Sequence, residues 1–231
     1  MYKTSFASAI MAASVAGNST PIFGTYPGWL EGTDQKGIQI ELFEDYLCSD
    51  CKTFNTVFEE VLAQPWLDGT VADQVGVGVT TFPLPYHVHS FQVNQLVPYF
   101  LALCTEGGGC YEKEYKDFAF KNQETILDMK DYSLNEFTAW WSGQVATEFN
   151  LSVIDVALNY SNDPYDTNWN TRVFWKYGTA KQVSGTPTAF LNGAKLDSVP
   201  MTVDGWMDLL NDTYNSQYGV ITPTKPKYPQ N

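Results

Sequence analysis

The sequence predicts an α/β fold in which a helical insertion interrupts a sheet domain. Three observations lead to this prediction: a strand pattern over residues 38–42 that runs through a CxxC motif into a helix, a second strand pattern over 75–82, and a return to strand-like sequence after residue 185. The intervening residues 90–182 have helical character. We therefore expect an insertion of about ninety residues between two halves of one sheet.

The first strand leads directly into the CxxC motif. Apolar residues alternate over 38–42, recur at helical spacing from Cys51 to Leu62, and stop near Pro65. This places Cys48 at a helix N-terminus, where free N–H groups and the positive end of the helix dipole stabilise a thiolate. Cys51 lies one turn further on, close enough to attack a mixed disulfide formed on Cys48.

Two other interpretations of the CxxC are half of a zinc site and an inert structural disulfide. Zinc needs four ligands, and the remaining candidates form no second CxxC or HxxxH; these candidates are Cys104, Cys110, His87 and His89. The strand-to-helix context favours a redox role. We interpret the two histidines as surface residues of a loop, without a chemical role.

Residues 90–182 contain five predicted helices. They cover 91–104 with a kink at Pro98, 111–127, a helix opened by the capping box Ser133 to Glu136 and ending at Phe149, 152–159 and 166–181. Four tryptophans are interpreted as core of the insertion or as its contact with the sheet: Trp140, Trp141, Trp169 and Trp175.

Cys104 and Cys110 bracket three consecutive glycines. Because glycine lets the chain fold back tightly, a local disulfide between them is geometrically plausible. Of the three pairings that four cysteines permit, the CxxC plus this bridge is the simplest. We interpret the bridge as structural, and as a sign of an oxidising compartment.

The chain returns to strand-like sequence after Pro187. The Asn192-Gly193 pair predicts a hairpin turn into a short strand at 194–196. A final amphipathic helix is expected over 205–214, and residues 217–231 form a tail.

Composition excludes some partners. The 231 residues suffice for one large domain with a substantial core. A net charge of −13 argues against nucleic acid and anionic lipid, which both need a basic surface. No apolar run after the N-terminus approaches the length of a membrane-spanning helix.

The N-terminal residues 1–17 predict a signal peptide, because a short apolar run with one lysine and no acid ends in small residues. The alternative is a leader that stays in a cytosolic protein. Four sequons are candidate glycosylation sites: Asn18, Asn150, Asn159 and Asn211. We expect a protein of the secretory pathway, in the ER lumen or outside the cell.

Three segments follow one another along the chain: FEDYLCSDC, then a strand ending in FPLP, and then SGTPTAFLNG after the helical insertion. This pattern, over residues from about 36 to 216, resembles the DsbA-like branch of the thioredoxin superfamily. The resemblance implies a thioredoxin-like domain built from 36–89 and 183–216, the insertion 90–182, and an irregular arm over 18–35.

The resemblance also implies roles for four residues. Cys48 would be the nucleophile and Cys51 the resolving thiol. Thr186-Pro187 would carry a cis peptide bond facing the cysteine pair, and its backbone would dock the substrate chain as an added strand. From the residues alone, Pro187 could equally be a trans proline that opens an edge strand.

The sequence departs from the family pattern at two places. The buried acid that related enzymes often carry six residues before the first cysteine is Leu42 here, with Glu41 and Glu44 only as sequence neighbours, so the resemblance supplies no proton acceptor for Cys51. The dipeptide between the cysteines is Ser49-Asp50, where strongly oxidising members carry a histidine. A carboxylate near Cys48 opposes its thiolate, which predicts a less depressed pKa for Cys48 and a weaker oxidant.

We therefore expect a monomeric thiol-disulfide oxidoreductase that acts on polypeptide substrates, with no metal and no cofactor. The direction of exchange depends on its reduction potential and on a redox partner that the sequence does not identify. One alternative is a non-catalytic peptide-binding or chaperone-like protein with a locked CxxC disulfide. Another is a glutathione-using transferase relative, against which the intact second cysteine argues.

Overall fold

The computed structural model describes residues 25–33 and 37–219. The expected signal peptide, Asn18 and residues 220–231 lie outside this range. The centre of the fold is a five-stranded sheet in the order β1-β5-β2-β6-β7. Its strands are β1 Trp29–Gly32, β2 Ile38–Glu44, β5 Val75–Thr81, β6 Thr188–Leu191 and β7 Ala194–Lys195.

Strand β2 runs through the middle of the sheet. It pairs parallel with β5 and antiparallel with β6, with Phe43 opposite Thr188. The predicted parallel pairing of the first two strands is therefore confirmed. Asn192 and Gly193 both have positive φ, of 49° and 81°, as a tight two-residue turn requires, and they join β6 to β7.

The N-terminal arm is partly regular. We expected residues 18–35 to be irregular, yet β1 pairs antiparallel with β5 and forms an edge of the sheet. Its four residues, Trp-Leu-Glu-Gly, are too few for a period-2 pattern to stand out in the sequence. Hydrogen bonding to β5 supplies what the local sequence does not.

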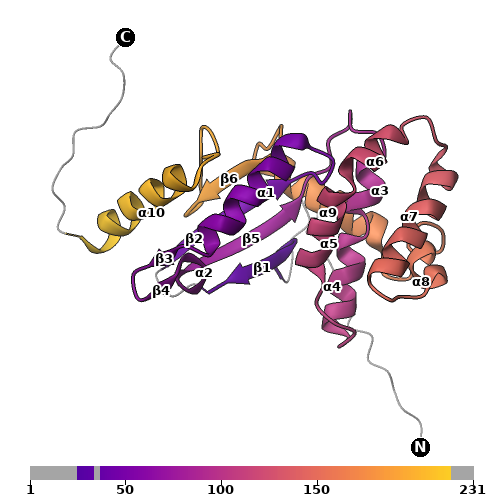
Figure 1. Ribbon diagram of the computed structural model, residues 1–231, viewed down its shortest axis with the longest axis horizontal. Coiled ribbons are helices and arrows are strands. Elements are labelled where there is room, and N and C mark those ends of the chain that lie inside the picture. The colour runs from indigo at the N-terminus through magenta and orange to yellow at the C-terminus, as the bar shows by residue number, and fades with distance from the viewer. Residues whose placement is uncertain (1–24, 34–36, 220–231) are drawn as a thin grey trace, which may run out of the picture.

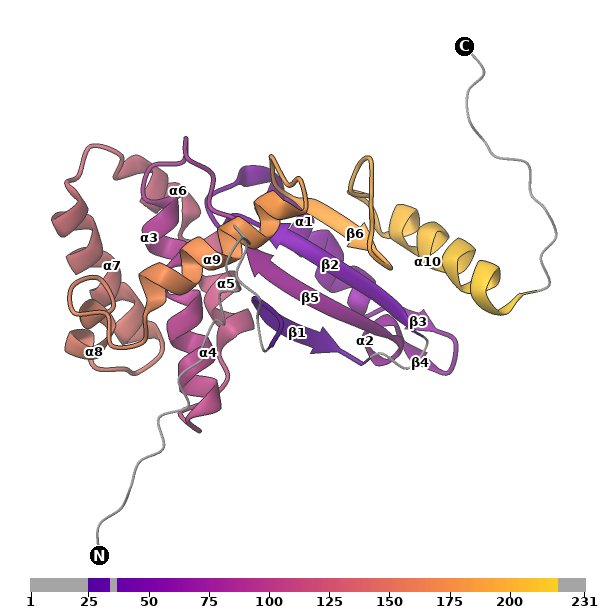
Figure 2. The ribbon, with the colours of Figure 1, turned by 180° about the vertical axis from the view of Figure 1, so that it is seen from behind.

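Helices cover both faces of the sheet. Helix α1 (Ser49–Leu62) crosses one face in Figure 1, and α9 (Thr167–Ala180) crosses the other in Figure 2. Gly178 lets α9 approach closely, because a Cβ there would come within 2.6 Å of the Phe82 ring. Helix α10 (Val203–Tyr218) packs on α1, where Trp206 lies against Phe54 and Phe58.

The two faces of the sheet belong to two separate cores. Ile38, Ile40 and Leu42 pack with α1 in the larger core, whereas Phe43 packs with the smaller cluster that also contains Phe82, Leu84, Val183 and Phe190. The alternation of β2 therefore orients successive side chains to opposite layers.

Between β5 and β6 the chain is helical, but in shorter pieces than predicted. The expected helix over 91–104 is two, α3 (Ser90–Asn94) and α4 (Val97–Thr105), and the one over 111–127 is also two, α5 (Glu112–Lys121) and α6 (Gln123–Asp128). Pro98 lies in the first turn of α4, where a missing N–H costs nothing, so it starts a helix rather than kinking one. The predicted capping box opens α7 (Leu134–Glu148), which α8 (Val153–Leu158) follows.

The remaining elements are short. A small hairpin of β3 (Pro65–Trp66) and β4 (Gly69–Thr70) precedes α2 (Val71–Gln74).

Trp141 is fully buried and Trp140 packs beside it, as predicted. Trp169 and Trp175 are 45% and 40% exposed and so do not lie in the core. Trp175 stacks on Phe82, which follows β5, so its predicted contact with the sheet is confirmed. Arg172 and Lys176 lie over the Trp169 ring. Among the described residues, no helix has both the length and the apolar content needed to cross a bilayer.

Candidate active site

Cys48 is the N-cap residue of α1. Its backbone is extended, with φ −81° and ψ 122°, and its carbonyl accepts the first bond of the helix from the N–H of Lys52. Its own N–H donates to the carbonyl of Asp45 at 3.0 Å, which closes the turn between β2 and the helix. The side chain therefore lies at the mouth of the helix, as the sequence predicts.

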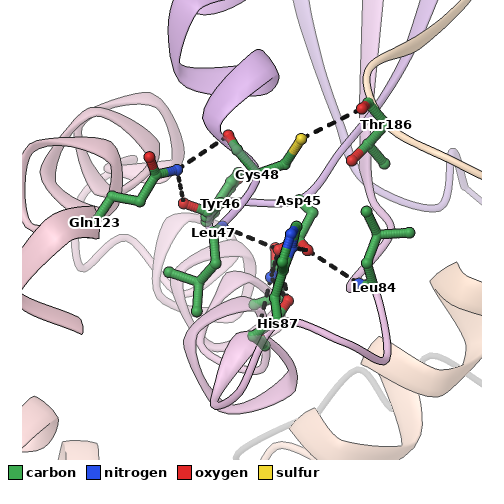
Figure 3. A network of polar contacts seen from close by, with 10 residues as sticks. Asp45, Tyr46, Leu47, Cys48, Leu84, His87, Gln123 and Thr186 are labelled. Atoms are coloured by element: carbon green, nitrogen blue, oxygen red, sulfur yellow. Dashed lines mark hydrogen bonds and ion pairs between the residues drawn. The ribbon is translucent and has the colours of Figure 1, made fainter. Parts of the chain in front are cut away.

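The Thr186–Pro187 segment faces this cysteine. Because Thr188 pairs with Phe43 in the sheet, the residues just before β6 lie beside the residues just after β2. The Cys48 Sγ lies 3.3 Å from the carbonyl oxygen of Thr186, and the peptide bond between Thr186 and Pro187 is cis (Figure 3). The four residues that the resemblance singled out are thus brought together at one end of the sheet.

The surroundings of Cys48 favour its thiolate. The pKa of Cys48 is lowered to about 6, chiefly by a hydrogen bond from the Cys51 thiol and, against the opposing effect of burial, by the Thr186 side chain and the backbone N–H groups of Cys51 and Asp50. Cys48 is 6% exposed, so the residue is largely buried but still reaches solvent. The Asp50 side chain is exposed. Whether it makes the protein a weaker oxidant stays a prediction.

Cys51 has the opposite character. It is fully buried, and burial raises the pKa of its thiol well above the usual value, with further contributions from Cys48 and from the charge of Glu44. The two cysteines are both free thiols in the structure. Cys48 can therefore attack a disulfide as a thiolate, while Cys51 stays protonated until a mixed disulfide has formed.

Glu44 restores the buried acid that the sequence appeared to lack. It is the last residue of β2, fully buried, and neither carboxyl oxygen has a hydrogen bond to any described group. Burial raises its pKa to about 7 although the ammonium of Lys116 lies 3.9 Å away. Glu44 lies four residues before Cys48 rather than six, so its position in the sequence does not mark it as the buried acid, and only its burial in the fold does.

Lys116 comes from α5, in the segment between β5 and β6. Its side chain is 2% exposed, and its ammonium lies near the carboxylates of Glu44 and Glu31 and over the Trp29 ring. Burial disfavours the charge on Lys116, but the charges of Glu44 and Glu31, with smaller effects of Glu59 and Asp117, outweigh burial and raise the pKa of Lys116. The insertion therefore contributes a buried cation to the environment behind Cys51.

Gln123 is a second residue that sequence reasoning missed. It begins α6, is 3% exposed, and its side-chain amide donates to the carbonyls of Tyr46 and Cys48 at 2.9 and 3.0 Å (Figure 3). It fixes the backbone of the turn that presents Cys48. No local sequence pattern marks a glutamine 75 residues away as its partner.

The histidines are not the surface residues we expected. His89 is 8% exposed, stacks on Phe137 and contacts the carbonyl of Met129 through Nε2. His87 is partly buried and lies 2.7 Å from the Asp45 carboxylate. The loop that carries both histidines folds back onto the turn before Cys48. This contact joins residues that are far apart in the sequence, so no local pattern predicts it.

Cys104 and Cys110 form the predicted local disulfide. Of the candidate glycosylation sites, Asn150 and Asn211 are exposed. Asn159 is fully buried and its amide donates to the carbonyls of Asp155 and Val156, so this fold leaves no room for a glycan there and that candidate was wrong.

With this geometry in view, the chain has a thioredoxin-like fold with a helical insertion, the fold of DsbA-like proteins. Similar solved structures are a provisionally assigned protein-disulfide isomerase from Pseudomonas syringae (18% identity, TM-score 0.58, covering 78% of this chain and 96% of that one) and a thioredoxin-like oxidoreductase from Silicibacter pomeroyi (12%, 0.52, 81% and 92%). A third is the thiol-disulfide exchange protein alpha-DsbA2 from Wolbachia pipientis (11%, 0.51, 81% and 86%). No family model and no curated protein sequence matches the chain.

Proposed function

We propose that the protein is a thiol-disulfide oxidoreductase acting on polypeptides. The observation that carries this proposal is the pairing of an acidic Cys48 at a helix N-terminus with a buried Cys51 one turn later, opposite the Thr186–Pro187 segment. The similar structures described as oxidoreductases and exchange proteins support it.

In the reducing direction, the Cys48 thiolate attacks one sulfur of a substrate disulfide. The substrate disulfide breaks, a Cys48–substrate bond forms, and one substrate thiolate leaves. Cys51 then loses its proton and attacks the Cys48 sulfur, which releases the second substrate thiolate and leaves a Cys48–Cys51 disulfide. Two electrons pass from the cysteine pair to the substrate, and oxidation of a substrate dithiol is the reverse.

Glu44 is the proposed acceptor of the Cys51 proton. Its pKa of about 7 suits a group that takes and returns a proton near neutral pH, and its oxygens are free of other hydrogen bonds to described groups. The backbone at Thr186 and Pro187 is the proposed docking strip for the substrate chain. The protein would act as a monomer, with a separate redox partner resetting the cysteines.

A secretory location is part of the proposal. The Cys104–Cys110 disulfide supports it, since such bonds persist in oxidising compartments. Expression with the native N-terminus, followed by sequencing of the secreted chain, tests it. Recovery of uncleaved chain from the cytosol alone would contradict it.

The decisive experiment compares wild type with Cys48→Ser and Cys51→Ala in insulin reduction by dithiothreitol. Wild type should accelerate the reaction, and Cys48→Ser should not. Incubated with insulin in the absence of dithiothreitol, Cys51→Ala should accumulate mixed disulfides that appear as larger species on a non-reducing gel and dissociate on reduction. A wild type without activity that still binds unfolded peptides would instead favour the non-catalytic alternative.

A further inference from the structure

Asp45 is the centre of a buried network next to Cys48. Asp45 directly follows β2 and is fully buried. Its carboxylate accepts hydrogen bonds from the backbone N–H groups of Leu47 and Leu84, at 3.0 Å each. The Ser90 hydroxyl and the Asn94 amide also donate to it. These bonds fix the carboxylate three residues before the nucleophile (Figure 3).

His87 completes this network. Its Nδ1 lies 2.7 Å from the Asp45 Oδ2, and its side chain is 21% exposed, so it can exchange protons with solvent. The Tyr86 ring packs edge-on against the imidazole with centroids 4.8 Å apart. A carboxylate at this distance favours the doubly protonated ring, in which both nitrogens donate.

The environment of His87 includes groups from three other elements. Asp45 comes from the turn after β2, Cys48 from the start of α1, and Arg172 and Lys176 from α9 line the same hollow of about 500 Å³ that His87 and its neighbour His89 line. The hydrogen bond to Asp45 is the largest influence on the pKa of His87 and raises it against the effect of burial, and the charge of Cys48 raises it further.

We propose that His87, held by the carboxylate of Asp45, carries a positive charge near Cys48, whose own N–H donates to the Asp45 carbonyl, and that this charge stabilises the Cys48 thiolate and so tunes its disulfide exchange. This inference rests on the proposed function for its biological meaning. His87 is a positioning residue for charge rather than a group that touches the reacting sulfurs. Because the effect depends on protonation, it weakens as pH rises through the titration of His87.

A purely structural role is the alternative, since a neutral imidazole could also donate from Nδ1 to Asp45 and hold the loop. The two roles differ in charge coupling. If the imidazolium and the thiolate stabilise each other, removing either must shift the titration of the other by the same amount. A structural histidine would produce no such reciprocity.

The chain is well suited to this measurement because it has only two histidines. Their ring protons are followed by NMR against pH in the reduced wild type and in Cys48→Ser. We expect the His87 titration to move to lower pH in Cys48→Ser, with the ring signals of His89, which stacks on Phe137, as the internal reference. Equal titrations of His87 in both proteins would overturn the proposal.

The reciprocal measurement uses Cys51→Ala as background, because the Cys104–Cys110 disulfide then leaves Cys48 as the single free thiol. His87→Gln should shift the thiolate absorbance titration of Cys48 to higher pH and slow its alkylation by iodoacetamide at about pH 6 by roughly 3- to 10-fold. His87→Lys, which keeps a positive charge, should largely restore the rate. His89→Asn, at a position with φ 68° that asparagine tolerates, should leave it unchanged.

The outcomes separate this proposal from the proposed function. An unchanged Cys48 titration in a folded His87→Gln protein would overturn the role of His87 even if insulin reduction is normal. A shifted titration in a protein that reduces no disulfide would support the charge coupling and contradict the oxidoreductase. Should His87→Gln not fold, the NMR comparison of wild type with Cys48→Ser decides alone.

Discussion

The carbonyl oxygen of Thr186 lies 3.3 Å from the sulfur of Cys48, although 138 residues separate them in the chain. The thiol donates to this carbonyl, whereas the buried Thr186 hydroxyl has no hydrogen bond to any described group in this state. The hydroxyl is placed to donate to the sulfur once it ionises, and it lowers the pKa of Cys48. One residue thus serves both protonation states of the nucleophile.

The Thr186 hydroxyl gives the first prediction. Thr186→Val keeps the shape and the backbone carbonyl but removes the donor, so the pKa of Cys48 should rise. Alkylation of Cys48 at about pH 6 should slow by roughly 5- to 10-fold, the effect of losing one hydrogen bond to a charged group. The matched control is Thr188→Val, whose hydroxyl donates to the Gly185 carbonyl instead. Equal alkylation rates for Thr186→Val and wild type would contradict the assignment.

Glu44 gives a prediction about pH and stability. Its pKa rises from 4.5 to about 7 on folding, so the folded state binds its proton more tightly, and stability from this group is lost as pH rises from about 4.5 through 7. Glu44→Gln should remove that loss. The free energy of unfolding of the variant relative to wild type should increase by on the order of 2 kcal/mol between about pH 5 and pH 7.5, measured by urea denaturation. A difference that is constant with pH would show that Glu44 does not titrate in this range.

The same substitution affects chemistry through Cys51. Without the charge of Glu44, the pKa of Cys51 should fall, but the resolving step loses its proposed proton acceptor. We expect slower release of mixed disulfides from Glu44→Gln near neutral pH, followed by quenched-flow and gel analysis. The control is Glu59→Gln, because Glu59 is a partly exposed acid on α1 that contacts Lys113 rather than a cysteine. Normal release in Glu44→Gln would exclude it as the acceptor.

Gln123 gives a prediction about the turn that presents Cys48. Gln123→Ala removes the side-chain donor to the Tyr46 carbonyl and one of the two donors to the Cys48 carbonyl, which keeps its bond from the Lys52 N–H, and should cost about 1–3 kcal/mol of stability. Gln64→Ala is the control, because its amide makes a single exposed bond to the Glu60 carbonyl and should matter by less than about 0.5 kcal/mol. Urea midpoints measure both, and similar losses for the two variants would contradict the special role of Gln123.

The Cys104–Cys110 disulfide gives the last prediction. Closing a loop with a sequence separation of six residues restricts the unfolded chain modestly, so Cys104→Ser with Cys110→Ser should cost about 2 kcal/mol of stability. Insulin reduction at a temperature where the variant is folded should stay near the wild-type rate. A large loss of activity in the folded variant would mean that this bridge takes part in exchange.

Local sequence patterns were enough to predict several features of the fold: the strand that enters a helix at the CxxC, the parallel second strand, the capping box of α7, the Asn192-Gly193 turn and the short disulfide loop. Each depends on residues within one or two turns of each other, so periodicity and spacing suffice to find them. The order of the motifs then led to the DsbA-like fold.

The remaining features depend on the three-dimensional fold. It paired the four-residue β1 with β5, turned Glu44 into a buried acid behind Cys51, brought Lys116 and Gln123 from the insertion, and folded His87 back onto Asp45. These relationships depend on burial and on contacts between distant segments, and a side chain's charge state follows from its surroundings in space rather than its neighbours in the chain. For that reason the cysteines could be read from the sequence, while the groups that control their protons could not.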